Sequence, residues 1–345
     1  MNLTAHSNST TYATLNDAER LTWAAWLAVI FTCSLLGDIT ILVTSTKYSA
    51  FKLHTLMVTF IQHISVCDLL ISIFVVFPTL TSLLADRWVF GRALCHVTAN
   101  FTVFGIPASS LLTCSMTAGK LWLLRYPLRA KSVSEKQAHL LCGGIWVLAL
   151  VPPALYLGVD KDDVEFCGNI YSCYYKHSSH SWEFLEPINH GLFGGLPLLI
   201  VISCSILLIS NLREARKVSD RSRGAVRWQG LVTVVAVASV FIIAVFPLTV
   251  YWICEPYLKS AVLHDVKASF SRIATTLFYL NVAPNVFLYF STVKSFRGFI
   301  RQAVSRFNDI ELSTEEQTAT HGGLSVQISG RRTSSDNMGA DYHLR

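Results

Sequence analysis

Two acidic residues stand inside long apolar stretches of the sequence. Asp38 is the one charged residue within 21–46, and Asp68 is the one Asp, Glu, Lys or Arg within 55–85. An ionised carboxylate is costly in an apolar environment, so such a residue faces a protein interior and serves an ion site, a proton relay or a counter-ion pair. The two positions therefore predict a buried polar site.

Motifs for enzymatic chemistry are missing from the sequence. It contains no glycine-rich phosphate loop, no His-Glu-x-x-His and no Gly-x-Ser-x-Gly. The eleven histidines are scattered, and His177 with His180 would bind a metal ion only weakly. The net charge of +6 is modest and unevenly placed, which does not favour nucleic acid as a partner. We therefore expect neither an enzyme nor a nucleic-acid-binding protein.

The elements that would hold the two aspartates are apolar runs of membrane-spanning length. Apolar residues make up 52% of the chain and charged residues 14%, against roughly 25% charged in soluble domains. Five further stretches lack Asp, Glu, Lys and Arg altogether: 93–119, 137–159, 187–212, 228–254 and 273–293. Each reaches the ~20 residues that a helix needs to cross hydrocarbon. Because a single span in lipid satisfies its backbone hydrogen bonds only as a helix, we predict an all-α membrane protein with seven transmembrane helices.

The distribution of basic residues gives this bundle a direction. Seventeen Lys and Arg residues fall in segments on the side of the C-terminus, and eight fall on the other side. The positive-inside rule therefore predicts an external N-terminus and a cytoplasmic C-terminus. Asn2 and Asn8 begin N-glycosylation sequons on the external side. The first twenty residues lack the apolar core of a cleavable signal peptide.

Four segments follow from these patterns: an extracellular tail over 1–21, the seven-helix bundle over 22–293, an amphipathic surface helix over 294–307 and a disordered cytoplasmic tail over 308–345. Apolar residues from Phe296 to Phe307 recur at helical spacing with basic residues around them, which is typical of a helix on an anionic membrane surface. The polar tail beyond it is rich in Ser, Thr and Gly.

Several motifs, in their order and spacing, resemble the rhodopsin-like (class A) G-protein-coupled receptors over about residues 22–307. They are Asp68 with its neighbours His63–Leu70, Trp88-Val89-Phe90-Gly91 with Cys95, Pro127-Leu128, Trp146, Pro197, Phe241 with Pro247, and Tyr289 followed by Phe296-Arg297. The resemblance implies a receptor that binds an extracellular ligand. Its partners would be heterotrimeric G proteins and arrestin, besides the lipid bilayer.

The resemblance also implies a disulfide between Cys95 and the loop that follows the fourth span. Two cysteines there are candidates, Cys167 and Cys173. The separation from Pro197 that is common in the family favours Cys173. Cys167 would then be free or paired with Cys254, and an oxidising outer face suits such a bridge.

A buried polar cluster is the second implied feature. Asp68, Ser109, Asn281 and Asn285 match the residues that surround a sodium ion in the family, and a small oxygen-lined site suits a hard cation. The alternative is a protonated Asp68 hydrogen-bonded to the two asparagines. Asp38 replaces the asparagine usual in the first span, so two carboxylates would be neighbours and would titrate as a coupled pair. No other metal or cofactor is expected.

The positions that usually change during activation depart from the family pattern. The Asp-Arg-Tyr motif at the inner end of the third span is Gly119-Lys120-Leu121 here. Lys120 cannot reproduce the planar fork of an arginine, although it still offers a cation to a partner. Val245 stands at the tryptophan switch of the sixth span, while Tyr289 is retained in the seventh. The interpretations are a divergent receptor with compensating residues, or one with weak, constitutive or non-G-protein signalling.

The ligand site that the resemblance implies has aromatic and amide groups but no buried formal charge. It comprises Thr102, Val103, Ile106, Asn189, His190, Phe193, Leu248, Thr249, Trp252, Thr275 and Tyr279. Tyr279 replaces the retinal lysine of opsins, and Thr102 replaces the aspartate of monoamine receptors. These substitutions favour a neutral small molecule or a peptide, and the acidic loop after the fourth span favours a basic peptide.

A transporter or channel with seven helices is the competing hypothesis. In that case the two buried aspartates would relay protons or cations. The ordered set of receptor motifs favours the receptor.

Overall fold

The structure is a computed structural model of the chain. It describes residues 15–47, 55–130, 132–160, 164–175, 182–217, 222–254 and 264–292, with Gly298 and Ser305 as isolated positions. The chain divides into two compact units, Met1–Phe299 and Ile300–Arg345. The fold given below is that of the first unit, because Ser305 is the one described position of the second.

Long apolar helices make up most of the described chain. They are α1 (Asp17–Lys47), α2 (Thr55–Ile71), α3 (Phe77–Ala85), α4 (Gly91–Arg125), α6 (Glu135–Ala149), α7 (Val151–Asp160), α8 (Trp182–His190), α9 (Leu196–Lys217), α10 (Ser222–Cys254), α11 (His264–Leu280) and α12 (Asn285–Thr292). A short helix, α5 (Pro127–Ala130), follows α4. Six helical segments of the described chain are long and apolar enough to cross a membrane. The predicted helical membrane fold is confirmed.

Prolines explain why two of these spans contain π-helical turns. Helix α2 continues through η1 (Ser72–Val76) into α3, where Pro78 stands at the start, and α8 continues through η2 (Gly191–Gly195) into α9, which begins just before Pro197. A proline inside a helix removes one N–H donor and its ring displaces the carbonyl four residues earlier. A wider π turn absorbs that displacement and lets the span continue.

Two other spans are broken rather than widened. Helix α6 gives way to α7 at Leu150, shortly before Pro152 and Pro153. Helices α11 and α12 are separated by a turn over 281–284 that ends at Pro284. Because each of these last two helices is short, the predicted seventh span is present as two consecutive pieces.

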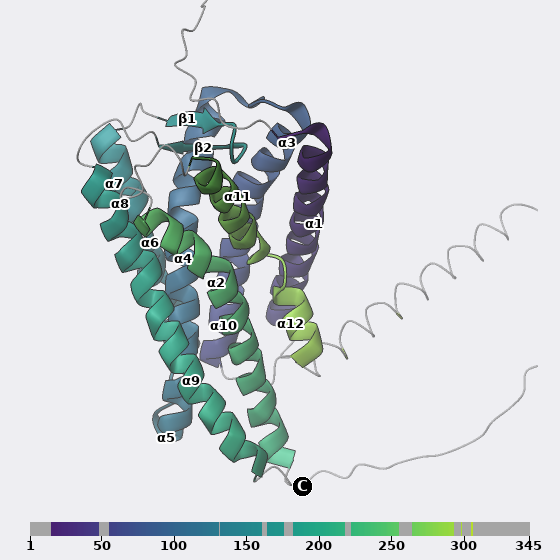
Figure 1. Cartoon of the computed structure of the whole chain (residues 1–345). Coiled ribbons are helices and arrows are strands. Elements are labelled where there is room, and N and C mark those ends of the chain that lie inside the picture. Colours follow the sequence, from purple (N-terminus) through teal and green to yellow (C-terminus); the bar gives the residue numbers. More distant parts are fainter. Residues whose placement is uncertain are drawn as a thin grey trace, which may run out of the picture. The chain divides into compact units, whose positions relative to one another are not determined.

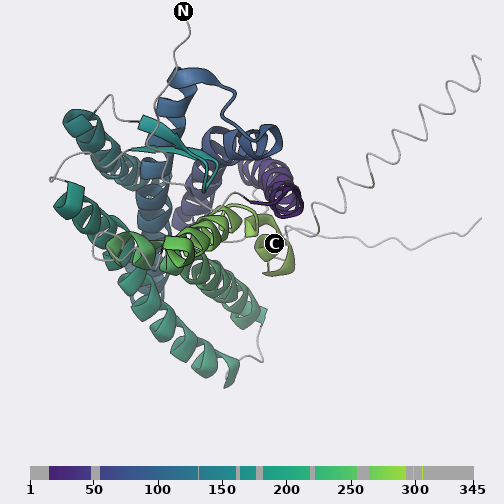
Figure 2. The same ribbon diagram turned by 45° about the horizontal axis from the view of Figure 1, so that its top comes forward.

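Helix α4 is the central element of the bundle. It contacts α2, α6, α9 and α10, while α1 packs against α2, α3 and α12, and α10 packs against α9 and α11. Figures 1 and 2 show the same arrangement from two directions, with the helices roughly side by side. The faces of α1, α6 and α9 that turn away from these neighbours carry exposed large apolar side chains, as expected for contact with lipid.

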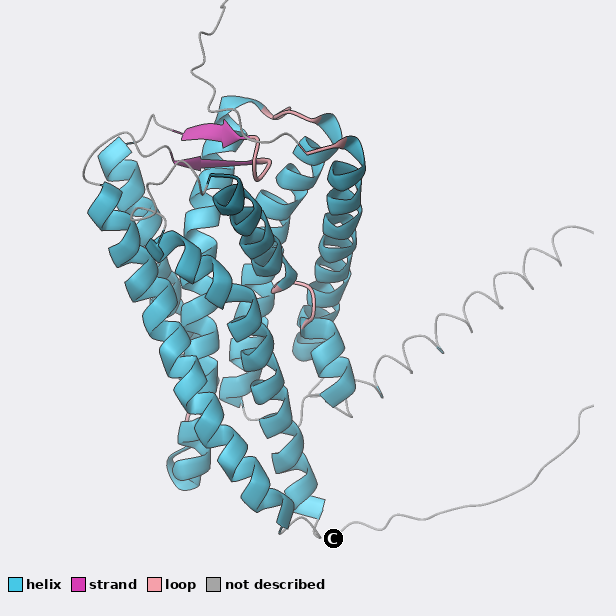
Figure 3. Cartoon of the chain, in the orientation of Figure 1, coloured by secondary structure: helices cyan, strands magenta, loops and turns pink. Residues whose placement is uncertain are grey.

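A two-stranded antiparallel hairpin closes one end of the bundle (Figure 3). Strand β1 (Val164–Cys167) pairs with β2 (Ser172–Tyr175), and Cys167 lies opposite Ser172 at the turn. We call this end of the bundle the hairpin end and the end that carries α5 the opposite end. No strand was predicted here, although tyrosine, which is favoured in strands, occupies positions 171, 174 and 175.

Several predicted segments lie outside the described residues. They include the tail with Asn2 and Asn8, nearly all of the predicted surface helix over 294–307, and the tail beyond it. The side chain of Tyr289 also lies outside the described part, although its backbone belongs to α12.

Candidate functional site

The disulfide at the hairpin end joins α4 to β2. Cys95 and Cys173 are bridged, with 5.3 Å between their Cα atoms. Both are buried, together with Ala99, Tyr156 and Tyr175, so the hairpin is packed as well as covalently tied. The favoured pairing is therefore confirmed. Cys167 and Cys254, offered as a second pair, are both free thiols.

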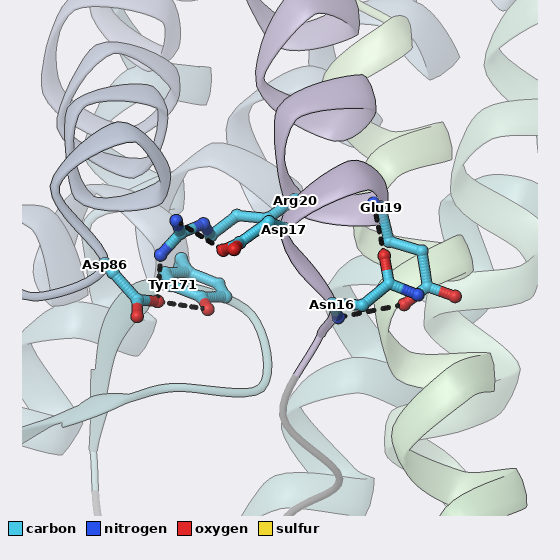
Figure 4. Close-up of polar contacts among 6 residues, drawn as sticks. All are labelled: Asn16, Asp17, Glu19, Arg20, Asp86 and Tyr171. Atoms are coloured by element: carbon cyan, nitrogen blue, oxygen red, sulfur yellow. Dashed lines mark hydrogen bonds and ion pairs between the residues drawn. The ribbon is translucent and has the colours of Figure 1, made fainter.

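The turn of the hairpin is fixed by an ionic contact (Figure 4). Arg20 of α1 lies 2.7 Å from Oδ1 of Asp86, the residue that ends α3, and the Tyr171 hydroxyl donates to the same oxygen over 2.8 Å. We call Arg20, Asp86 and Tyr171 the latch. The Arg20 guanidinium, followed by the Tyr171 hydroxyl, lowers the pKa of Asp86. Burial, followed by the hydrogen bond to Asp86, raises the pKa of Tyr171 to about 12.

The same turn also reaches the seventh span. Asn169 donates its side-chain N–H to the carbonyl of Ala268 over 3.2 Å, and Arg272 donates to Asn169 Oδ1 over 3.1 Å. The hairpin turn thus contacts α1, the end of α3 and α11. Sequence reasoning did not find these contacts, because charged residues at the ends of spans are common and carry no spacing signal.

The predicted ligand-site residues are mostly buried between α4, α8, α10 and α11. Ile106, Asn189, His190, Leu248, Thr249, Thr275 and Tyr279 are buried, while Thr102, Val103, Phe193 and Trp252 are partly exposed. The hydroxyl of Thr102 bonds to the carbonyl of Thr98 in its own helix. This hydroxyl group therefore already donates its hydrogen within α4 and does not donate it to another residue of the site.

Two observations show that some of the predicted ligand-site residues lie close together. The rings of His190 and Trp252 are stacked, with centroids 5.6 Å apart and planes at 9°. A Cβ atom on Gly194 would meet Thr249 Oγ1 at 3.1 Å and Ile106 Cγ2 at 3.8 Å. A glycine in the π turn therefore lets α4, η2 and α10 approach closely. Tyr279 lies farther away, facing Thr79 and Ser172.

A buried acidic residue that the predicted ligand site did not include lies next to two of its members in the chain. Glu186 of α8 is buried, at 5% exposure, one helical turn before His190. Its charge acts on Tyr156, whose hydroxyl lies in hydrogen-bonding range of Asn189. Glu186 lies one residue before the uncharged run 187–212, so charge spacing alone places it outside the predicted span.

The predicted polar cluster in the middle of the bundle is partly assembled. Asn285 of α12 donates to Asp68 Oδ2 over 2.5 Å, and Ser109 of α4 faces Cys67. The other oxygen of Asp68 has no hydrogen-bond partner among the described residues. Asn281, in the turn that ends α11, is partly exposed, and its side chain makes no described hydrogen bond to Asp68.

Asp38 lies beside this cluster through a pair of serines. Ser34 donates to Asp38 Oδ2 over 2.8 Å and contacts Ser72 Oγ at 2.7 Å. Asp38 follows Ser34 by one helical turn, and Asp68 precedes Ser72 by one turn. Since α1 and α2 run in opposite directions, both carboxylates lie on the same side of the serine pair. The two aspartates are therefore neighbours.

The residues at the opposite end of α4 fit closely against α2. Lys120 is buried at 8% exposure. A Cβ atom on Gly119 would meet Met57 Cε at 3.4 Å and Phe60 Cε2 at 3.5 Å, which is ordinary contact. A Cβ atom at this position therefore fits without displacing backbone.

A chain of aromatic hydrogen bonds joins α2 to α6. Trp146 donates its ring N–H to His63 Nδ1 over 3.0 Å, and His63 Nε2 lies 3.1 Å from His139 Nδ1. His63 therefore accepts on Nδ1 and carries its proton on Nε2. No group of three or more His, Cys, Asp or Glu side chains in the described part of the chain is arranged to hold a metal ion.

The fold and the disulfide define a multi-pass helical membrane protein with a hairpin tied over one end. The comparison with known families is more specific: residues 37–289 match the family described as 7 transmembrane receptor (rhodopsin family). The chain belongs to that family, which is one of receptors rather than enzymes or transporters.

Individual relatives are distant. Over 291 residues the chain is 24% identical to C-C chemokine receptor type 1 of Homo sapiens, a match covering 81% of this chain and 78% of that receptor. It is 24% identical over 348 residues to the B2 bradykinin receptor of Rattus norvegicus, covering 94% and 86%. It is 26% identical over 191 residues to C-C chemokine receptor type 3 of Cavia porcellus, and that match spans about half of each chain, 54% and 52%.

Proposed function

We propose that this protein is a plasma-membrane receptor that binds a peptide ligand at the hairpin end and signals through heterotrimeric G proteins at the opposite end. The observation that carries the proposal is the family match over 37–289, since it spans most of the bundle. The hairpin supports it, because a disulfide fixes it to α4 at the end where the ligand is proposed to bind.

The proposed orientation puts the hairpin end outside the cell. The greater number of Lys and Arg residues on the side of the C-terminus supports it. So does the disulfide, because such bonds persist on oxidising surfaces. The sequons at Asn2 and Asn8 would then be accessible to glycosylation.

A peptide ligand is supported by the names of two relatives, which are receptors for chemokines and for bradykinin. The stacking of His190 of α8 on Trp252 of α10 is consistent with a ligand site that residues of these two helices share. A neutral small molecule remains the second candidate, supported by the apolar and amide side chains of Ile106, Leu248 and Asn189.

The polar cluster fits a sodium ion. Asp68 has a buried oxygen without a described hydrogen-bond partner. Ser109, Asn281 and Asn285 would complete an oxygen donor set of the kind that a hard cation prefers. A bound cation would offset the negative charge of Asp68. The carboxylate of Asp38 would also stabilise that cation. Such a site would stabilise one arrangement of α2, α4 and α12.

Signalling through G proteins is proposed despite Gly119 and Lys120. The buried position of Lys120 places a cation near the opposite end of α4, where a partner's carbonyl groups would meet it. Arrestin is a second proposed partner at the same end. The alternative is a receptor with weak or constitutive output, because the acid that would restrain the cation is absent from this position.

One experiment tests the proposal directly. The full chain is expressed at the cell surface, and basal second-messenger output is measured beside a variant carrying Gly119→Asp and Lys120→Arg. A Cβ atom fits at Gly119, and the added carboxylate would pair with the introduced arginine, so the variant should show altered basal output when compared at equal surface expression. Equal, background-level output from both forms, at equal surface expression and across all G-protein classes, would contradict coupling.

A further inference from the structure

Glu186 is a charge buried at the hairpin end of the fifth span. Its exposure is 5%, and it belongs to α8, which begins at Trp182. A buried carboxylate attracts cations more strongly than an exposed one, because little solvent screens its charge. Its position within one helical turn of Asn189 and His190 places that charge beside the predicted ligand-site residues.

Aromatic residues lie in the same region of the fold as Glu186. Tyr156 of α7 is close enough for the charge of Glu186 to act on it, and its ring centroid lies 5.2 Å from that of Tyr175 on β2. One helical turn after Glu186, His190 is stacked on Trp252 of α10. A carboxylate and aromatic faces in one region favour an organic cation, because both carry negative potential.

Two buried polar atoms nearby have no hydrogen-bond partner among the described residues. They are Asn189 Oδ1 and Thr249 Oγ1, on residues exposed by 7% and 3%. Asn189 follows Glu186 by three residues in α8, and Thr249 lies one turn before Trp252 in α10. An amide oxygen left without a donor is costly in a buried site, so a ligand with N–H groups would be stabilised here.

We propose that Glu186, Asn189, Tyr156, His190 and Trp252 form a subsite for a positively charged nitrogen group of the ligand, a guanidinium or a protonated amine. The inference rests on the proposed receptor function and specifies the chemistry that this receptor recognises. Glu186 supplies the charge, Asn189 Oδ1 accepts an N–H, and Trp252 covers one face of the cation. The proposed peptide would therefore present a basic side chain or its amino terminus to α8.

The test uses benzamidinium as the cationic probe and benzamide as its neutral counterpart of nearly equal shape. The purified full chain in lipid nanodiscs is heated with each probe at a series of concentrations, and the unfolding temperature is measured. Benzamidinium should raise the unfolding temperature in a saturable manner, because it binds the folded form. Benzamide should not.

Variants then locate the effect. Glu186→Gln keeps the shape and removes the charge, so the apparent Kd for benzamidinium should rise roughly tenfold or more. Glu135→Gln, at the exposed start of α6, is the matched control and should keep the wild-type shift. If Glu186→Gln does not fold, Trp252→Leu serves as a second variant. It should weaken the binding of benzamidinium, because it removes the aromatic face that would contact the cation.

The outcomes are separate from those of the signalling experiment, because no G protein takes part. The absence of a benzamidinium shift, an equal shift with benzamide, or an unchanged shift in both Glu186→Gln and Trp252→Leu would overturn the subsite. A receptor that binds benzamidinium through Glu186 but gives no second-messenger signal would keep the subsite and contradict the proposed coupling.

Discussion

Tyr171 and Arg20 meet at a single oxygen atom of Asp86, although they lie 151 positions apart in the chain. The hydroxyl of Tyr171 donates to Oδ1 over 2.8 Å, and the guanidinium of Arg20 lies 2.7 Å from the same atom. Figure 4 shows that Arg20 comes from α1 and Tyr171 from the turn of the hairpin. The latch therefore joins the start of the first span to the hairpin through the residue that ends α3.

Substituting Asp86 should destabilise the hairpin end at neutral pH. In Asp86→Asn the charge is lost, so we expect a lower unfolding temperature than in the wild type. Because the latch lowers the pKa of Asp86, its stabilisation is present above the ordinary pKa of an aspartate and is lost as pH falls through the lowered value. The difference between the two proteins should stay constant from about pH 8 to about pH 5 and shrink below about pH 4. A difference that shrinks already between pH 8 and 6 would contradict the assignment.

Tyr171 should keep its donor role over a wide pH range. Its pKa is raised to about 12, so the hydroxyl group stays protonated at neutral and moderately alkaline pH. Tyr171→Phe removes the hydroxyl and keeps the ring that packs on Trp23 and Phe166. We expect a loss of roughly 1 kcal/mol, because the bond is partly exposed and screened. Combining it with Asp86→Asn should add little, and full additivity in a double-mutant cycle would show that the two residues act independently.

The disulfide should stabilise the bundle more than any other contact at the hairpin end. It closes a loop of 78 positions, for which chain entropy predicts about 4 kcal/mol. Cys95→Ser, Cys173→Ser and the double substitution should all reduce surface expression equally, because each removes the same bond. Cys167→Ser, a free thiol in the same hairpin, is the control and should leave expression unchanged. A larger loss with Cys167→Ser would contradict the observed pairing.

Much of the fold could be predicted because long apolar runs leave few structural choices in lipid. The spans and the bridge to Cys173 followed from charge spacing and from the family resemblance. The breaks at Leu150 and at 281–284 were not predicted, although Pro152, Pro153 and Pro284 mark them in the sequence. A proline inside a span removes a backbone N–H donor, so these three positions carry a signal that apolar composition alone does not.

The site was harder to predict than the fold, since its contacts join residues far apart. Asp86 and Arg20 are separated by 66 positions, and neither lies in a motif. Glu186 was missed because the count of uncharged residues excluded it from the span by one position. His63 shows the same limitation: it belongs to a motif that was used, but its contacts with Trp146 and His139 depend on the packing of α2 on α6.

The role of His63 can be separated from simple packing. Its Nδ1 atom accepts from the indole of Trp146, and in an asparagine Oδ1 occupies the equivalent position. His63→Asn should therefore remain close to wild type in unfolding temperature. His63→Phe keeps the ring but leaves the indole N–H without an acceptor, at a cost of roughly 1 kcal/mol or more. His139→Gln, on a more exposed side chain, should change little, and a loss equal to that of His63→Phe would mean that the whole chain of contacts matters.

Asp38 and Asp68 should differ in their tolerance of neutral replacement. Asp38 accepts a hydrogen bond from Ser34, which an asparagine oxygen also accepts, so Asp38→Asn should reach the surface at near wild-type level. Asp68 contacts Asn285 and has a further buried oxygen suited to a cation, so Asp68→Asn removes the charge on which the cluster depends. We expect a clear loss of surface expression for Asp68→Asn, measured by flow cytometry on a tagged N-terminus. Equal loss in both variants would mean that the neighbouring carboxylates act as one unit, with neither residue dominant.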